Sequence, residues 1–429
     1  MNYYNNNTIT NIFIYLHMII LLPECIYEIL LLLNPKELLL CSQINYQFKN
    51  LYNLESLWRD QIDKKYKTIL KKDTYFETCE VFFQLKLLIK HLNLKISIKR
   101  LYELEMLDLH SKKIIEVPKQ IGQLKNLLKL RLNNNMLINL PGEISQLSNL
   151  KHLQLQRNKL IKFPKEITTL INLRRLILDH NKLIKISKKI GQLPNLTWLS
   201  LSNNKLKELP KEIGKLTNLK ILALDHNLLT TLPKEIRQLQ NLYRFWLQNN
   251  KLTTLPKEID QLSKLGSIGL GDNMLTEIPK ELCNLYNLEF INVSSNILTE
   301  LPPEISRLTN LDTIWCTCNE LLELPKEICQ LTKLKNLQLS GNELLELPKE
   351  MRNLINLELL TLGWNQLTDL PEKINNLTNL RFLDLNNNRL TKLSTEICKL
   401  TQLRSLKLDG NQINELPNEI YKLTNLIIN

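Results

Sequence analysis

Four of the six histidines are candidates for a proton acceptor in catalysis: His110, His152, His180 and His226. A histidine that activates a nucleophile must lie within hydrogen-bond reach of a serine or cysteine. These histidines fall in different segments of the chain, and none is paired with such a nucleophile. The sequence therefore contains no catalytic constellation, and we expect a protein that is not an enzyme.

Two other groups of residues suggest a metal or a cofactor at first sight. Cys316 and Cys318 are closely spaced, but alternate strand positions should direct their side chains differently, and zinc needs four convergent ligands. Gly266, Gly269 and Gly271 resemble a phosphate loop, but that motif requires a strand-to-helix context that is missing here. We expect no metal and no cofactor.

A column of asparagines with a period of 23 residues sets the architecture that positions all of these groups. The column consists of Asn135, Asn158, Asn181, Asn204, Asn227, Asn250, Asn273, Asn296, Asn319, Asn342, Asn365, Asn388 and Asn411. A fixed period in this range indicates stacked structural repeats. Fourteen copies begin between Leu104 and Leu403, and we number them one to fourteen.

Each copy reads L-x-x-L-x-L-x-x-N-x-L-x-x-L-P-x-x-I-x-x-L-x-x, and each part of it predicts a local structure. The L-x-L core alternates with period two, which is typical of a short strand with its leucines inward. The asparagine amide can satisfy backbone groups where the chain turns away from that strand. Proline then ends strand pairing, and the following run has helical spacing. Proline occupies this position in every repeat from Pro118 to Pro417, except at Ser187 and Ser394.

This pattern resembles the leucine-rich repeat, in the 23-residue form of intracellular Ras-group scaffolds. The resemblance covers residues 101–429 and implies an α/β fold: a solenoid of about 14 repeats with a parallel sheet on its concave face. Such solenoids are binding surfaces built from units that cannot fold alone.

Composition places few limits on function. The chain has 429 residues, a net charge of +13 and a pI of about 9.2, but most lysines stand beside glutamates in the P-K-E column. The eight cysteines form no disulfide framework, which favours a reducing compartment, cytoplasmic or nuclear. Residues 1–21 contain a short apolar run without the basic start of a signal peptide, and Pro23 and Glu24 interrupt it. We therefore expect no membrane association.

Residues 22–62 precede the repeats and contain a second pattern: Leu22-Pro23, two apolar helical runs separated by Asn34-Pro35, and a closing Leu57-Trp58-Arg59. This segment resembles an F-box. The resemblance implies docking on a Skp-type adaptor of a cullin–RING ubiquitin ligase. The implied adaptor contacts are Leu22, Pro23, Ile26, Leu30 and Leu38. Residues 63–100 have helical apolar spacing, and we expect them to be a connector that caps the first repeat.

Departures from the repeat identify candidate binding residues on the outward strand positions. They are aromatic or basic side chains: Trp198, Trp246, Trp315, Trp364, Phe290, Arg244, Arg175, Arg157, Arg131, His180 and His226. Exposed aromatic residues are frequent binding anchors. We expect Trp246 and Trp315 to stand about 14 Å apart across a shallow notch floored by the glycines of repeat eight, from the strand spacing. The basic residues of repeats two to four are suited to an acidic peptide or a phosphate.

Three functions remain open at this stage. The first is a substrate-recruiting subunit of a cullin–RING ligase that binds a protein target on the concave face. The second is a signalling scaffold that binds a small GTPase or phosphatase, with the head only a cap. The third is a basic solenoid for nucleic acid or an anionic surface, although no base-stacking motif accompanies the charge. The style of an F-box joined to such regular repeats resembles proteins of amoebae and their giant viruses, and a viral protein of this style would act in a host cell.

The last residues, 426–429, begin a fifteenth strand. An uncapped sheet edge can pair with another chain, so we expect weak self-association there or a cap supplied by a partner.

Overall fold

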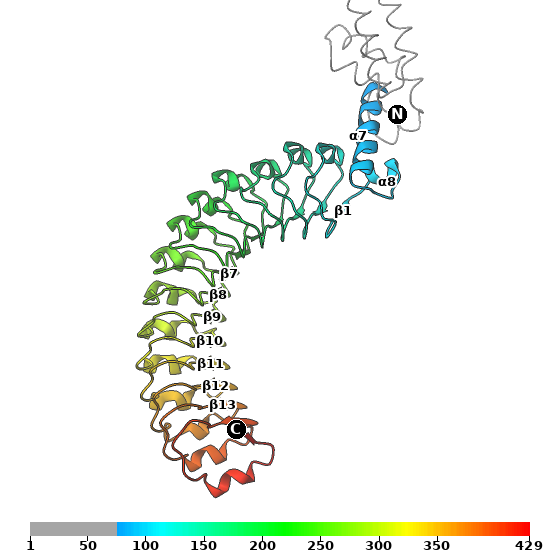
Figure 1. The fold of residues 1–429 in the computed structure, drawn as a ribbon. Coiled ribbons are helices and arrows are strands. Elements are labelled where there is room, and N and C mark those ends of the chain that lie inside the picture. The colour runs from blue at the N-terminus through cyan, green and yellow to red at the C-terminus, as the bar shows by residue number, and fades with distance from the viewer. Residues whose placement is uncertain (1–74) are drawn as a thin grey trace, which may run out of the picture. The chain divides into compact units, whose positions relative to one another are not determined.

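The computed structural model describes residues 75–429, which divide into two compact units (Figure 1). In the first unit, helix α7 (Tyr75–His91) contacts the 3₁₀ turn η1 (Lys119–Gln123) and helix α8 (Ile98–Tyr102). The helical character expected of the connector is therefore present in its described part. Among the described helices, none combines the length and apolar content that crossing a membrane requires. The F-box-like segment 22–62 lies outside the described residues, so its helices stay a prediction.

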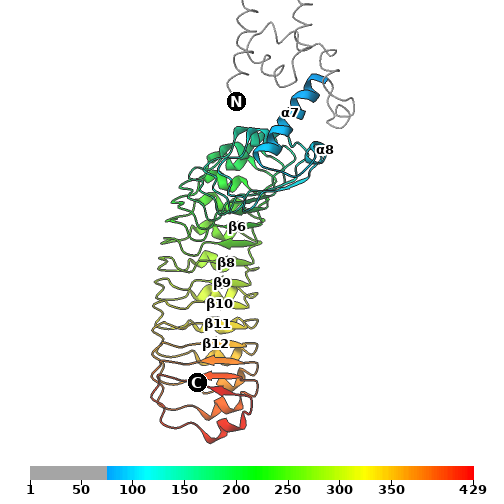
Figure 2. The ribbon, with the colours of Figure 1, turned by 45° about the vertical axis from the view of Figure 1, so that its right-hand side comes forward.

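The second unit is one parallel sheet whose fifteen strands follow sequence order (Figure 2). The strands are β1 (Met106–Asp108), β2 (Lys129–Arg131), β3 (His152–Gln154), β4 (Arg175–Ile177), β5 (Trp198–Ser200), β6 (Ile221–Ala223), β7 (Arg244–Trp246), β8 (Ser267–Gly269), β9 (Phe290–Asn292), β10 (Thr313–Trp315), β11 (Asn336–Gln338), β12 (Leu359–Thr361), β13 (Phe382–Asp384), β14 (Ser405–Lys407) and β15 (Ile427–Ile428). Each strand of β1–β14 belongs to the repeat of the same number. The expected α/β repeat solenoid is confirmed.

Short 3₁₀ turns line the outer side of the curve, opposite the strands (Figure 1). They are η2 (Gly142–Gln146), η3 (Lys165–Thr169), η4 (Lys188–Gln192), η5 (Lys211–Lys215), η6 (Lys234–Gln238), η7 (Lys257–Gln261), η8 (Lys280–Asn284), η9 (Pro303–Arg307), η10 (Lys326–Gln330), η11 (Lys349–Asn353), η12 (Ile374–Asn376), η13 (Thr395–Lys399) and η14 (Asn418–Lys422). The repeat leucines between the two sides are buried, as Leu130 and Leu132 illustrate, so neighbouring repeats share one continuous core.

The ladder asparagines join each repeat to the one before it. The amide nitrogen of Asn227 donates to the carbonyl of Leu224 in its own repeat and to that of Leu201 in the previous repeat, at 2.9 and 3.0 Å. Its Oδ1 accepts the backbone N–H of Leu206 at 3.0 Å. The same set of bonds recurs along the column, so the side chain satisfies buried backbone groups as predicted.

Two further columns carry hydrogen bonds that the pattern alone did not reveal. The asparagine of the x-N-L segment donates to a backbone carbonyl 24 residues earlier, as Asn218 does to Pro194 at 2.8 Å. The residue before each ladder asparagine has a positive φ, including His180 and His226 at 51° and 54°. This left-handed conformation aims its N–H at the next repeat, where that of His226 reaches the carbonyl of Gln248 at 2.8 Å.

The two serines in the proline column each cap the start of the following 3₁₀ turn with their hydroxyl group. Ser187 Oγ accepts the N–H of Lys189 at the start of η4, and Ser394 Oγ accepts that of Glu396 at the start of η13, at 3.2 and 3.3 Å. Serine is a favoured cap because its hydroxyl satisfies a free backbone donor. The two exceptions to the pattern therefore keep the outer turn intact.

We predict that Asn227→Ala lowers the free energy of unfolding by about 2 kcal/mol or more. The substitution leaves the buried N–H of Leu206 without an acceptor, at about 1–3 kcal/mol, and removes one of the two amide donors to the carbonyls of Leu201 and Leu224, which keep Asn204 and Asn250. The matched control is Asn218→Ala at the end of the preceding repeat, which removes one exposed bond that water can replace; it should cost about 1 kcal/mol or less. Urea unfolding followed by circular dichroism measures both. Equal losses would contradict the role assigned to the ladder.

Candidate protein-binding face

Three aromatic side chains converge on the concave face, and we call them the aromatic cluster: Trp246 on β7, Phe290 on β9 and Trp315 on β10. The Phe290 ring meets Trp246 edge-to-face at 6.0 Å between centroids and Trp315 at 5.0 Å. Each ring is half-buried. Since the strand leucines occupy the inward positions, these rings project outward and are held by one another.

The prediction of a notch between Trp246 and Trp315 is wrong, because the Phe290 ring lies between the two indole rings. The distance between these indoles is therefore shorter than the ~14 Å of three strand spacings. The glycines of repeat eight are not a bare strip either. A Cβ at Gly269 would collide with the Gln248 side chain, and one at Gly266 with the Tyr243 ring. Both glycines leave room for side chains of the preceding repeat. Side chains of repeat seven therefore occupy the space beside these glycines, and the aromatic cluster lies next to a filled surface and not a notch.

Polar groups rim the aromatic cluster. Tyr243 donates its hydroxyl proton to Glu289 Oε2 at 3.3 Å, and the Arg244 guanidinium lies 5.9 Å from the Tyr243 ring centroid. The indole N–H of Trp315 is buried and finds no acceptor among the described residues. An apolar centre with a polar margin and a free donor is the composition of a protein-recognition site.

The other two tryptophans are separate from the cluster. Trp198 on β5 is covered by the guanidinium of Arg175, whose carbon lies 3.7 Å from the ring centroid. Trp364 follows β12 in the left-handed position, with φ of 58°, and is 68% exposed. A bulky side chain is uncommon in that conformation, which asparagine and glycine fill in several other repeats. The outward position expected of all four repeat tryptophans is therefore observed, but only Trp246 and Trp315 share a ring neighbour, Phe290.

The basic end of the face is partly neutralised within the fold. Arg131 on β2 donates to Asp108 on β1 at 3.0 Å, and Asp108 also contacts His110 at 2.7 Å. Arg131, a predicted partner-binding residue, therefore already has a carboxylate beside it, because parallel register pairs it with Asp108. Arg175 is similarly engaged with Trp198. Arg157, His180 and His226 are exposed in the left-handed column at the rim.

His152 on β3 lies among cations that neighbouring strands supply. Burial lowers its pKa first, and the positive charges of Lys129, Arg175, Arg174 and Lys151 lower it further. The neutral imidazole is therefore favoured. An anionic group placed there would be attracted by these cations and would raise the pKa of His152 again.

A band of serine and aspartate side chains separates the basic end from the aromatic cluster. Asp179 accepts the hydroxyl of Ser200 at 2.6 Å and the N–H of Ser202 at 2.9 Å, while the Ser202 hydroxyl donates to Asp225 at 2.5 Å. Burial raises the pKa of Asp179, and these hydrogen bonds oppose that rise. Since the band is bonded internally, it gives the face a fixed acidic middle.

Among the cysteines of the repeats, Cys283, Cys316 and Cys329 are buried. Cys316 is buried and Cys318 is exposed, so their side chains do diverge. Burial raises the pKa of Cys316 to about 12, and the buried thiols of Cys283 and Cys329 are also raised to about 12. Within residues 75–429, no group of three or more histidine, cysteine or acidic side chains has the geometry of a metal site.

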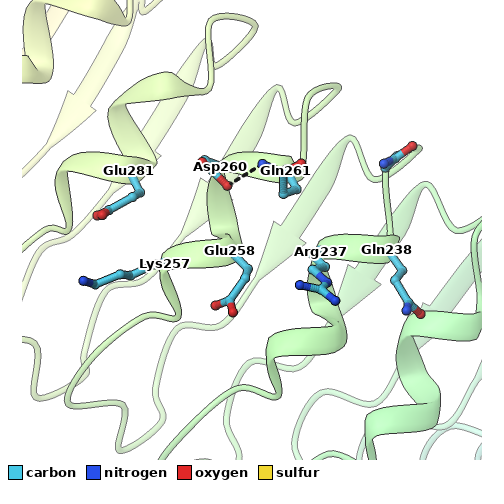
Figure 3. Close-up of a pocket in the computed structure, with 8 residues that line it drawn as sticks. Arg237, Gln238, Lys257, Glu258, Asp260, Gln261 and Glu281 are labelled. Carbon is cyan, nitrogen blue, oxygen red and sulfur yellow. Dashed lines mark hydrogen bonds between the residues drawn. The ribbon is translucent and has the colours of Figure 1, made fainter.

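A hollow of about 520 Å³ lies on the outer side, between η6, η7 and η8 (Figure 3). All of its lining side chains are polar or charged: Arg237, Gln238, Gln240, Lys257, Glu258, Asp260, Gln261 and Glu281. Gln261 donates to Asp260 at 2.9 Å. Small-molecule pockets are mostly apolar, so this hollow is a dip in a solvated charged surface and not the candidate site.

Comparisons with known proteins agree with this architecture. A family model described as a leucine-rich repeat region matches residues 184–294, 275–369 and 365–428. A structure of a leucine-rich repeat protein from Leptospira interrogans is 40% identical over 78% of this chain and 99% of its own, with a TM-score of 0.65. A comparison with curated protein sequences finds no significant match.

Two more distant structures share the fold. The plant peptide hormone receptor RGFR1, solved in complex with RGF2, is 32% identical over 73% of this chain and 57% of its own, with a TM-score of 0.62. An internalin from Listeria monocytogenes is 22% identical over 80% of this chain and 93% of its own, also with a TM-score of 0.62. At that identity the internalin indicates the fold alone.

We predict that His152 titrates below its usual pKa of about 6.5 and that Lys129→Gln moves the pKa upward, because one of the surrounding positive charges is removed. Since folding lowers this pKa, the neutral form is favoured in the folded state. The contribution of His152 to the free energy of unfolding is therefore fully present above about pH 6.5. It is lost as the pH falls through the pKa that His152 has in the unfolded chain. An NMR pH titration of the imidazole measures the pKa. A midpoint that Lys129→Gln leaves unchanged would contradict the coupling.

Proposed function

The chain belongs to the leucine-rich repeat family, and from this premise we propose that it recruits a protein target to a cullin–RING ubiquitin ligase. Leucine-rich repeat proteins are generally non-enzymatic scaffolds for protein–protein interaction. The proposal has two parts: a concave face that binds the target, and the F-box-like segment 22–62, which docks on a Skp-type adaptor.

The aromatic cluster is the observation that carries the first part. Trp246, Phe290 and Trp315 form a contiguous apolar patch on three of four neighbouring strands, in a face that is otherwise mainly polar. Large aromatic side chains at the centre of a surface supply most of the free energy of protein binding.

The electrostatics of the face orient the target. Lys129, Arg174 and Arg175 favour an acidic segment at β2–β4, while Asp179 and Asp225 favour a neutral or basic segment beyond it. Charge complementarity of this kind selects partners and register more than it adds affinity. We propose that the target crosses repeats three to ten, with its acidic end toward the first repeats and an apolar residue on the aromatic cluster.

The sequence of residues 22–62 supports the second part. Leu22-Pro23, the Asn34-Pro35 break and Leu57-Trp58-Arg59 occur in the order that an F-box requires. The proposed contacts are apolar side chains that lie in an adaptor groove: Leu22, Pro23, Ile26, Leu30 and Leu38. Ligase recruitment also implies an intracellular site of action, which suits the free thiols of Cys283, Cys316, Cys318, Cys329 and Cys398.

We predict that Trp246→Ala with Trp315→Ala reduces recovery of protein targets at least about tenfold, because two central anchors are removed. The measurement is quantitative mass spectrometry after affinity purification of the full chain. Phe382→Ala on β13, an outward aromatic residue distant from the cluster along the sheet, is the matched control and should retain the targets. Unchanged recovery with the tryptophan pair replaced would refute the site.

A second prediction concerns the adaptor. Leu22→Ala with Pro23→Ala and Leu30→Ala should abolish co-purification of a purified Skp-type adaptor, since the apolar contacts are lost. The variant without Trp246 and Trp315 serves as the control, because it should keep the adaptor while losing targets. If the unaltered chain does not bind the adaptor but still retains protein targets, the signalling-scaffold function replaces the ligase function. If binding instead requires nucleic acid and falls steeply with salt, the third function replaces both.

A further inference from the structure

The four residues that follow each ladder position form a flank of the solenoid, between the strands and the outer turns. In repeats three and four the flank reads Lys159-Leu160-Ile161-Lys162 and Lys182-Leu183-Ile184-Lys185. The leucines are buried in the core, while the lysines are exposed and the isoleucines are 46% and 50% exposed. The described residues form no ion pair with these lysines. The flank therefore carries an apolar row edged by positive charge on both sides.

The same flank has the opposite charge toward the other end of the sheet. In repeats ten and eleven it reads Glu320-Leu321-Leu322-Glu323 and Glu343-Leu344-Leu345-Glu346. Leu321 and Leu344 are buried, whereas Leu322 and Leu345 are 53% and 54% exposed and all four glutamates are exposed. Here too the described residues form no ion pair with the charges. The column that holds isoleucine between lysines thus holds leucine between glutamates.

Exposed apolar residues at this position are not required by the fold. In repeats six to nine the same column is occupied by threonine: Thr230, Thr253, Thr276 and Thr299. Those repeats have the same strand, turn and ladder bonds. An apolar row on a soluble surface marks an interaction site, so the isoleucines and leucines need an explanation outside the repeat.

We propose that this flank binds the same flank of a second copy of the chain, in an antiparallel dimer with a twofold axis at repeat seven. In this arrangement repeat three faces repeat eleven of the partner, and repeat four faces repeat ten. Each K-L-I-K segment then meets an E-L-L-E segment, so that Ile161 faces a leucine and Lys159 and Lys162 face glutamates. Twofold symmetry repeats the contact at the other end of the flank.

The sequence of the flank satisfies the conditions for a twofold interface. Such an interface must be self-complementary, and two segments of opposite charge placed equally far from the axis have this property. The threonines near the axis are small and uncharged, so they allow close approach at the centre. Lys251 in repeat seven meets its own copy there, an unfavourable pair that the complementary segments on either side must outweigh. A parallel arrangement would place lysine on lysine and glutamate on glutamate, which costs free energy at every pair. An anionic membrane would attract the first segments but repel the second.

Charge reversal tests the dimer by analytical ultracentrifugation at several protein concentrations. The variant Lys159→Glu with Lys182→Glu, and the variant Glu320→Lys with Glu343→Lys, should each raise the dimer dissociation constant at least tenfold, because like charges then face one another. An equimolar mixture of the two variants should dimerise again, since the first flank position of these four repeats is then acidic in one chain and basic in the other, while the fourth position keeps its original pairs. This rescue does not occur if the substitutions merely disturb folding.

Two controls separate the flank from other surfaces. Lys211→Glu with Lys234→Glu makes the same change of charge on the outer turns η5 and η6 and should leave the dimer intact. Ile427→Lys alters the exposed end strand β15 and should also leave it intact. A chain that stays monomeric at all concentrations, reversed variants that dimerise normally, a mixture that fails to dimerise, or loss of the dimer only with Ile427→Lys would each overturn the proposal.

Discussion

The hydrogen bond between a ladder asparagine and the backbone of the previous repeat is the interaction on which the rest of the structure depends. The L-x-L strands leave carbonyl and N–H groups unpaired where the chain turns toward the outer side, and those groups are buried beside leucines. The asparagine amide supplies both donor and acceptor in a side chain short enough to reach them. Because one donor bond crosses to the preceding repeat, the side chain also fixes the stacking register.

A constant register places equivalent residues of successive repeats side by side along the surface. The residue types in one such column can therefore vary without changing another column. The outward strand positions can hold Arg131, Trp246 or Gly269 without affecting the core, since the strand leucines alone fill the interior. The flank positions can likewise change from lysine to glutamate between repeats. One frame can therefore carry the two proposed surfaces, the concave face for a target and the flank for a second copy. Function in this chain is encoded in the departures from the repeat.

Much of the frame could be predicted from the sequence, because it depends on residue spacing. The strands, the buried leucines and the bonding role of the ladder asparagines all follow from fixed columns. The second asparagine column was also visible, as Asn218 illustrates, but a polar residue in an exposed segment does not by itself indicate a bond across repeats. The positive φ of the residue before each ladder asparagine could not be predicted from the sequence, for another reason. Arginine, histidine and tryptophan occupy this position beside asparagine and glycine, so no residue type marks its backbone conformation.

The details of the candidate site required coordinates. The sequence placed Trp246 and Trp315 on the concave face, but strand spacing alone predicted a gap between them. Their rings approach Phe290 diagonally across the sheet, and that direction is set by side-chain torsions. The pairing of Arg131 with Asp108 was predictable in principle, because parallel register places residues 23 apart side by side. Outward residues 23 positions apart are neighbours in adjacent strands, and this relation is the clearest sequence signal for such contacts.

Internal pairing decides which parts of the concave face are available to a target. Arg131 is bonded to Asp108, Arg175 covers Trp198, and Asp179 is bonded to two serines, so a ligand must compete with existing partners there. Exchanging one such contact for another gains little free energy. The exposed parts of the aromatic rings, in contrast, are apolar and lose water when they are covered. For the proposed target, binding free energy should therefore concentrate at β7–β10, while the charged end selects among the targets that can reach it.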